Sequence, residues 1–111
     1  MAELHETPFD DAEHAFFHMV QYQRARHDGA RFVAGAGLYN RPSHPDDIRI
    51  VIDRLYRQKK LGHDHIKILK HFGVRMMPPD DRRENEKRAY DLWHDAMGII
   101  GAELRRKGII E

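Results

Sequence analysis

The residues most able to do chemistry in this sequence are basic and lie in the middle of the chain. Residues 54–75 carry seven Lys and Arg residues against one aspartate, whereas residues 1–20 carry five carboxylates and no Lys or Arg. The formal net charge of the whole chain is only +1, so the separation of charge says more than the total. The basic segment either pairs with the acidic segment inside the fold or faces an anionic partner.

Most of these cations fall on one side of a predicted helix over about 63–72. Residues 63, 67, 70 and 71 are spaced i, i+4, i+7 and i+8, so they share the face opposite the apolar residues of that helix. A short helix with cations outward suits a DNA groove, because phosphate neutralisation supplies most of the binding free energy. The predicted binding surface, for double-stranded DNA, consists of Lys59, Lys60, His63, Lys67, Lys70, His71 and Arg75.

The two helices around Gly62 match a helix-turn-helix only in part. With Gly62 as the turn glycine, Leu61 and Ile68 fall at positions that should be buried, but Arg57 stands where an apolar residue is expected. The four residues on the central face include no Arg, Asn or Gln, the types that usually read base edges. A plain solvated face is therefore the competing interpretation, because many helices carry outward lysines for solubility alone.

The nine histidines raise the question of a metal site. His14 and His18 are spaced i, i+4, which allows two imidazoles to share a metal, but a site needs three or four converging ligands. The chain has no cysteine and no H-E-x-x-H motif. We expect no resident metal or cofactor, and the pair is left as an open alternative.

Catalytic signatures are absent as well. Asp64 with His65 and His94 with Asp95 are adjacent pairs, and adjacent residues on a helix point in different directions. The glycine stretch over 33–38 lacks the further glycine or Gly-Lys-Ser/Thr that phosphate-binding fingerprints require, so it is interpreted as a turn. The sequence predicts a protein that is not an enzyme.

The elements that must position these residues form an all-α fold of four helices. Apolar periodicity predicts helices over about 10–27, 63–72 and 80–107, and a further helix that has Pro45 near its first turn and Lys60 at its C-terminal end. A capping box over 43–46 should begin the second helix, Gly73 should follow the C-cap of the third, and Gly108 should end the fourth. Residues 30–44 should form a loop, and a short strand could form at 31–34 or 109–111. The apolar tail over 109–110 should pack back onto the fold or pair with another segment.

The long C-terminal helix carries the alternative function. Its apolar stripe around Trp93 either forms a seam with a partner or a second copy of the chain, or is covered by the other three helices. In the first case the protein would be a non-enzymatic adaptor that binds another protein through residues 80–107.

Length and composition set the remaining expectations. A chain of 111 residues fits one domain, here 9–111 after a flexible end over 1–8. No apolar run approaches the ~18 residues of a membrane span, and the acidic first 20 residues do not resemble a signal peptide. The expected location is the cytoplasm, which the lack of cysteine fits.

Overall fold

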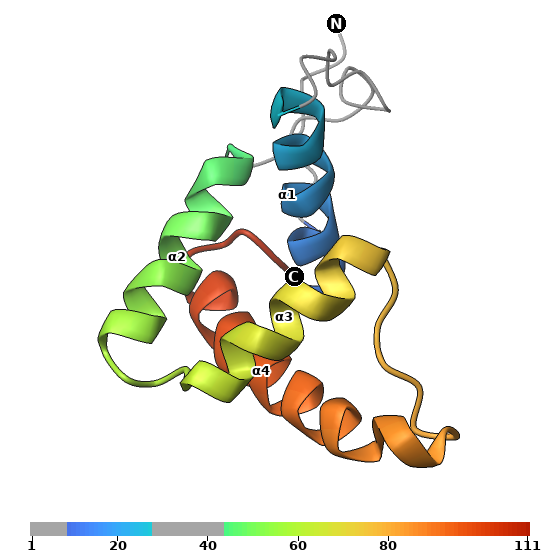
Figure 1. The fold of residues 1–111 in the computed structure, drawn as a ribbon. Coiled ribbons are helices and arrows are strands. Elements are labelled where there is room, and N and C mark those ends of the chain that lie inside the picture. The colour runs from blue at the N-terminus through green and yellow to red at the C-terminus, as the bar shows by residue number, and fades with distance from the viewer. Residues whose placement is uncertain (1–8, 28–43) are drawn as a thin grey trace, which may run out of the picture.

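The regular structure of the protein is helical in the part that the computed structural model describes, residues 9–27 and 44–111. The elements are α1 (Ala12–His27), α2 (Pro45–Arg57), α3 (His63–Arg75), the short 3-10 helix η1 (Glu84–Glu86) and α4 (Lys87–Arg106). The all-α fold with a long C-terminal helix is thus confirmed. Helices α1 and α4 each contact the three other α-helices, and α3 crosses in front of α4 in the view of Figure 1. The expected flexible end over 1–8, the strand at 31–34 and the glycine turn over 33–38 lie outside the described residues.

The core is organised around Trp93 of α4, whose side chain is 1% exposed. Phe17 stacks on the indole at 5.6 Å between ring centroids, and Phe16 meets it edge-on at 5.7 Å. Phe72 of α3 approaches from another side at 6.3 Å. The indole N–H donates a 2.8 Å hydrogen bond to the Glu13 carboxylate, which satisfies the polar atom of an otherwise buried ring. Trp93 therefore joins α1, α3 and α4.

Helix α2 begins one residue later than the predicted capping box implies. The cap is His44, whose Nδ1 accepts a 3.1 Å hydrogen bond from the Asp46 amide. The Asp47 carboxylate in turn accepts a 3.0 Å bond from the His44 amide. Pro45 is the first helical residue, where its missing N–H costs nothing. The box is thus real, but it uses residues 44 and 47.

Helices α2 and α4 both end in a Schellman motif. After α2, Lys59 adopts a left-handed conformation (φ 63°) and the Lys60 amide donates to the Leu55 carbonyl at 2.9 Å. After α4, Gly108 takes the same role (φ 78°) and the Ile109 amide donates to the Leu104 carbonyl at 2.9 Å. The prediction that Gly108 ends the last helix is confirmed, whereas the lysine in the equivalent position after α2 is strained.

The prediction that Gly73 follows the end of α3 is wrong. The helix continues to Arg75 and ends at Met76, which has a left-handed φ of 54°. Gly73 instead lies inside the helix, where a Cβ atom would come within 3.2 Å of Phe16 Cζ. The glycine is thus explained by the close packing of α3 against α1, and not by a helix end.

The predicted start of the last helix at residue 80 is also wrong. The Asp80 carboxylate accepts a 2.9 Å hydrogen bond from the Arg82 amide and a 3.1 Å bond from its guanidinium. These bonds from Arg82 lower the pKa of Asp80. The Asp80 amide donates to the Glu86 carboxylate at 3.0 Å, so local side-chain bonds take the place of helical ones. Helix α4 proper is consequently about 30 Å long, against the ~40 Å expected.

The C-terminal tail packs back onto the start of the chain, as the apolar pair at 109–110 predicts. Ile109 and Ile110 are buried, and Ile110 forms an isolated parallel bridge with Phe9. The Phe9 amide donates to the Ile109 carbonyl at 3.1 Å, and the Glu111 amide donates to the Phe9 carbonyl at 3.0 Å. The two ends of the described chain thereby close the core together.

Candidate nucleic-acid interface

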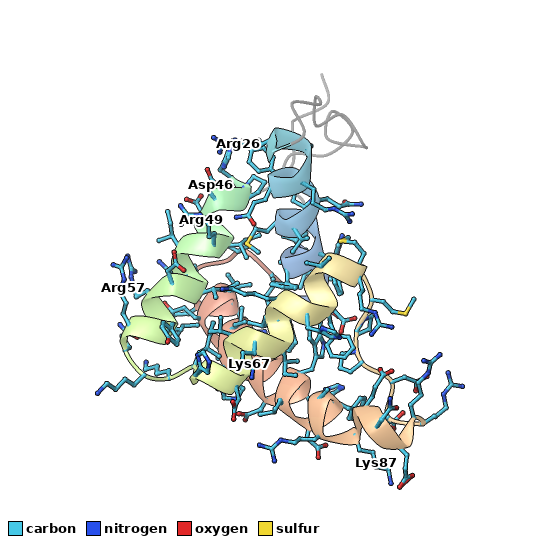
Figure 2. All side chains as sticks on the ribbon, viewed as in Figure 1. Arg26, Asp46, Arg49, Arg57, Lys67 and Lys87 are labelled. Atoms are coloured by element: carbon cyan, nitrogen blue, oxygen red, sulfur yellow. The ribbon has the colours of Figure 1, made fainter. Side chains whose placement is uncertain are left out.

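Helix α3 has one apolar side and one basic side. Leu69, Phe72 and Gly73 are buried against the rest of the protein, while Ile66 and Ile68 are half-buried. The opposite side is exposed from the first to the last turn. It carries His63, Lys67, Lys70, His71 and Arg75. Figure 2 labels Lys67 on this helix, which lies in front of α4 in the view shown.

The connection between α2 and α3 adds two more exposed cations, Lys59 and Lys60. All seven residues that the sequence predicts for a binding surface are therefore accessible to a partner. We call these seven residues the basic face. The structure brings five of them onto one helix and places the other two just before the N-terminal end of that helix.

The basic face keeps its positive charge. Within residues 9–27 and 44–111, no carboxylate forms an ion pair with any of the seven residues. Asp64, the single acidic residue of α3, lies 3.8 Å from Arg88 of α4. The Arg75 guanidinium lies over the Phe72 ring at 5.4 Å, so this side chain leans toward its own helix. The field of the basic face is therefore not cancelled locally.

Some arginines on other surfaces are paired with carboxylates, although Arg54 and Arg57 of α2 form no such pair among the described residues. Arg49 pairs with Asp53 at 3.0 Å along α2, and Arg83 lies 3.6 Å from Glu86. Exposed pairs such as these contribute little stability, but they do neutralise the surface on which they lie. The contrast separates the basic face from the mixed charge found on the outer side of α2.

The start of α3 is fixed by His65. The Gly62 amide donates a 2.9 Å hydrogen bond to His65 Nδ1, which gives the helix a cap. His65 Nε2 lies 2.6 Å from the Asp95 carboxylate of α4. Because Nδ1 accepts a hydrogen bond from the Gly62 amide, the ring hydrogen must be on Nε2, which donates it in a hydrogen bond to Asp95. One side chain thus caps α3 and ties it to α4.

The same geometry argues against a catalytic role for this carboxylate–imidazole pair. A general base needs a free ring nitrogen within reach of the proton it abstracts. In His65, one nitrogen is bound to the Gly62 amide and the other to Asp95. Sequence reasoning considered only adjacent carboxylate–imidazole pairs and missed this contact, because it joins residues 30 positions apart.

The helix-turn-helix hypothesis has mixed structural correlates and stays a prediction. Leu61 is 1% exposed, as the template requires, and Ile68 is half-buried. Arg57, at the position where the template expects an apolar residue, is exposed on the outside of α2 (Figure 2). Helices α2 and α3 diverge from the connecting residues 58–62 (Figure 1).

One residue of the candidate surface was missed by sequence reasoning. Val74 is 70% exposed and lies on the basic side of α3, seven positions after Lys67 and four after Lys70. The predicted helix ended at residue 72, which hid this spacing. An exposed methyl group on such a face can contact the methyl group of thymine.

The histidine pair proposed for metal binding does not belong to a larger cluster. His14 Nδ1 accepts a 3.3 Å bond from the Asp10 amide, while the rings of His14 and His18 both contact Phe9. Among the described residues, no three His, Cys, Asp or Glu side chains are grouped as metal ligands would be.

The stripe of α4 that carries the alternative function is covered by the chain itself. Trp93, Ala96, Ile100 and Leu104 are buried in the core. The large apolar side chains that remain exposed in the described part of the chain lie elsewhere, at Ile50, Tyr56, Val74 and Met77. No observation therefore favours a partner or a second copy on this stripe.

Within the ranges 9–27 and 44–111, no helix is long and apolar enough to cross a membrane.

Comparison with known proteins identifies no relative of this chain. No protein-family model matches the chain, and neither the curated proteins nor the solved structures contain a significant match. The candidate function must therefore be argued from the site alone.

Proposed function

We propose that the protein binds nucleic acid, and double-stranded DNA in particular, through the basic face. The observation that carries the proposal is an exposed helix side with several cations, none of which forms an ion pair with a carboxylate of the described residues. Each phosphate that a Lys or Arg neutralises releases condensed counterions, and this release drives binding without regard to sequence. Lys59, Lys60, Lys67, Lys70 and Arg75 are the five permanent cations available for such contacts.

The dimensions of α3 suit this role. Its 13 residues span about 20 Å, and a single helix fits the major groove, which is about 12 Å wide. Lysines without Asn or Gln neighbours act as point charges for phosphates and discriminate poorly between bases. Val74 is the one apolar group on this side that can contact a base edge. The proposed activity is consequently binding with weak sequence preference.

The test is fluorescence anisotropy of a labelled random duplex with the wild-type protein and with Lys67→Glu/Lys70→Glu. The double variant should lose binding while its helical circular dichroism and Tm stay near wild type, because both side chains are exposed. A matched control is Arg24→Glu/Lys87→Glu, which changes the net charge equally at two exposed positions of α1 and α4. Lys87 lies well away from Lys67 (Figure 2), so the control should retain most of the affinity. Equal loss in both variants, or no loss in either, would refute the basic face as the binding surface.

A further inference from the structure

A second concentration of positive charge lies where the C-terminal ends of α2 and α4 meet. A pocket of about 270 Å³ is lined there by four cations, Arg54, Lys60, Arg106 and Lys107, and by Glu103. Val51 and Leu55 supply its apolar part. The sequence hides this pocket, because residues 76–111 are nearly neutral in sum and the three α4 residues lie more than 40 positions after Lys60. We call it the basic pocket.

The lysines and arginines of the basic pocket are not needed to cap the two helices. Cations often lie at helix C-terminal ends because the last carbonyls lack partners there. In α2, the carbonyls of residues 54, 55 and 56 accept from the amides of residues 58, 60 and 59 at 2.9–3.0 Å. In α4, the carbonyls of residues 103, 104 and 105 accept from the amides of residues 107, 109 and 108 at 2.9–3.1 Å. The side chains of Arg54, Lys60 and Lys107 are thus not required as helix caps and can face another anion.

The basic pocket has fewer carboxylates than cations among its lining residues. Glu103 is the one carboxylate among its described lining residues, and Arg106 holds it through a hydrogen bond of 3.2 Å from Nε. The guanidinium of Arg106, with smaller contributions from Lys107 and Lys60, lowers the pKa of Glu103. Arg54, Lys60 and Lys107 form no ion pair with a carboxylate within 4 Å in the described part of the chain.

The other pockets differ in chemistry. The pocket between α1 and α4 mixes Asp11 and Glu13 with Arg105, so its charges largely cancel. The groove between α1, α2 and α3 is mostly apolar, and its Asp53 is paired with Arg49. A shallow site on α2, lined by Arg49, Asp53, Arg54 and Arg57, also has an excess of positive charge, but Arg49 and Asp53 are paired there. The basic pocket has four cations against one carboxylate.

We infer that the basic pocket binds a small phosphate-bearing anion, such as a phosphomonoester. A phosphate dianion accepts several hydrogen bonds at once, and lysine and arginine donors at the mouth of one pocket match that need. The apolar side formed by Val51 and Leu55 leaves room for a short organic group attached to the phosphate. This inference does not rest on the proposed function, since Lys60 is the one residue that the two surfaces share.

The test uses inorganic phosphate and pyrophosphate as probes, titrated into the full-length protein and followed by amide chemical shifts. Saturable shifts should concentrate at residues 54–61 and 103–109, and sodium chloride at equal ionic strength should not reproduce them. Lys60→Gln/Lys107→Gln should weaken phosphate binding about tenfold or more, because two charge-assisted hydrogen bonds are lost. Glu103→Gln should tighten it several-fold, since it removes the competing carboxylate and frees Arg106.

The control is Lys67→Gln/Lys70→Gln, which removes the same charge from the basic face and should leave the phosphate Kd within about twofold, because neither lysine lines the pocket and salt screens exposed charges. Shifts that chloride reproduces, a lack of saturation, or equal weakening by both double variants would overturn the inference. If the pocket variant weakens binding to duplex DNA while neither phosphate probe binds, the pocket is part of the nucleic-acid surface and the inference is wrong. Phosphate binding without any DNA binding would refute the proposed function and support the inference.

Discussion

The salt dependence of DNA binding offers the sharpest quantitative test of the basic face. For B-DNA, the slope of log affinity against log salt is about −0.9 for each phosphate neutralised. The five permanent cations of the basic face set an upper bound of about −4.5. Raising the salt fourfold, from about 50 to 200 mM, should then weaken binding by up to ~500-fold.

The perturbation is Lys67→Gln/Lys70→Gln, which removes two positive charges and introduces no repulsion. Three permanent cations remain on the basic face, so the bound on the slope falls to about −2.7. The same increase in salt should weaken the variant by up to ~40-fold. Both residues are exposed and have no ion-pair partner among the described residues, so the fold should not change.

The assay is fluorescence anisotropy of a labelled duplex at four or more salt concentrations, with a fixed anion. The decisive quantity is the difference between the two slopes, because a general loss of affinity in the variant would lower its line without changing the slope. A slope difference of about 1.8, which corresponds to two phosphates, supports direct contact by Lys67 and Lys70. Parallel lines, or affinity that does not respond to salt, would refute the assignment of phosphate contacts to this helix side.

Three further outcomes follow from the structure. Lys59→Gly should raise the free energy of unfolding by about 0.5–1 kcal/mol in urea titrations, because Lys59 is held at a positive φ that glycine adopts freely; an unchanged or lower midpoint would contradict this. Glu13→Ala should cost about 1–3 kcal/mol, because it leaves the buried Trp93 indole N–H without its acceptor, whereas Glu13→Gln should cost clearly less; equal losses would show that the hydrogen bond is not the cause. The Glu103 carboxyl should titrate below its ordinary pKa and move upward in Arg106→Gln, as followed by side-chain NMR. A depressed pKa means that the contribution of Glu103 to stability is present above its unfolded-state pKa and is lost as the pH falls through its folded-state pKa. A titration midpoint of Glu103 that is unchanged in Arg106→Gln would refute the pairing.

The helices and the general position of the basic face were predictable because they depend on local sequence. Apolar spacing indicates where each helix lies, and the i, i+4, i+7 pattern of cations follows from the helix period. The exact ends were less predictable, because two neighbouring signals were misleading. Gly73 resembles a helix stop but is required for contact with Phe16, and the polar stretch after Pro79 resembles a helix start but is held by Asp80.

The parts of the site that were missed depend on contacts between distant residues. The pairing of His65 with Asp95 needs α3 and α4 to lie side by side, and no pattern within either helix encodes it. The basic pocket likewise needs the ends of α2 and α4 to meet, which brings Lys60 near Lys107. Sums of charge over segments hide such a cluster, because Glu103 and other acidic residues of α4 cancel the cations in the count.

The attachments of α3 show why its outer side can act as a rigid surface. Its first turn is hydrogen-bonded to α4 through His65 and Asp95. Near its C-terminal end, Gly73 packs against Phe16 of α1. The Gly73 contact is buried, while the His65–Asp95 contact lies at the edge of the interface, so the backbone that carries Lys67 and Lys70 is fixed at both ends. A helix held only by exposed ion pairs would move relative to the core, because such pairs contribute little. Positioning by the packing of Gly73 and by one capping histidine leaves Lys67 and Lys70 available to an anionic partner.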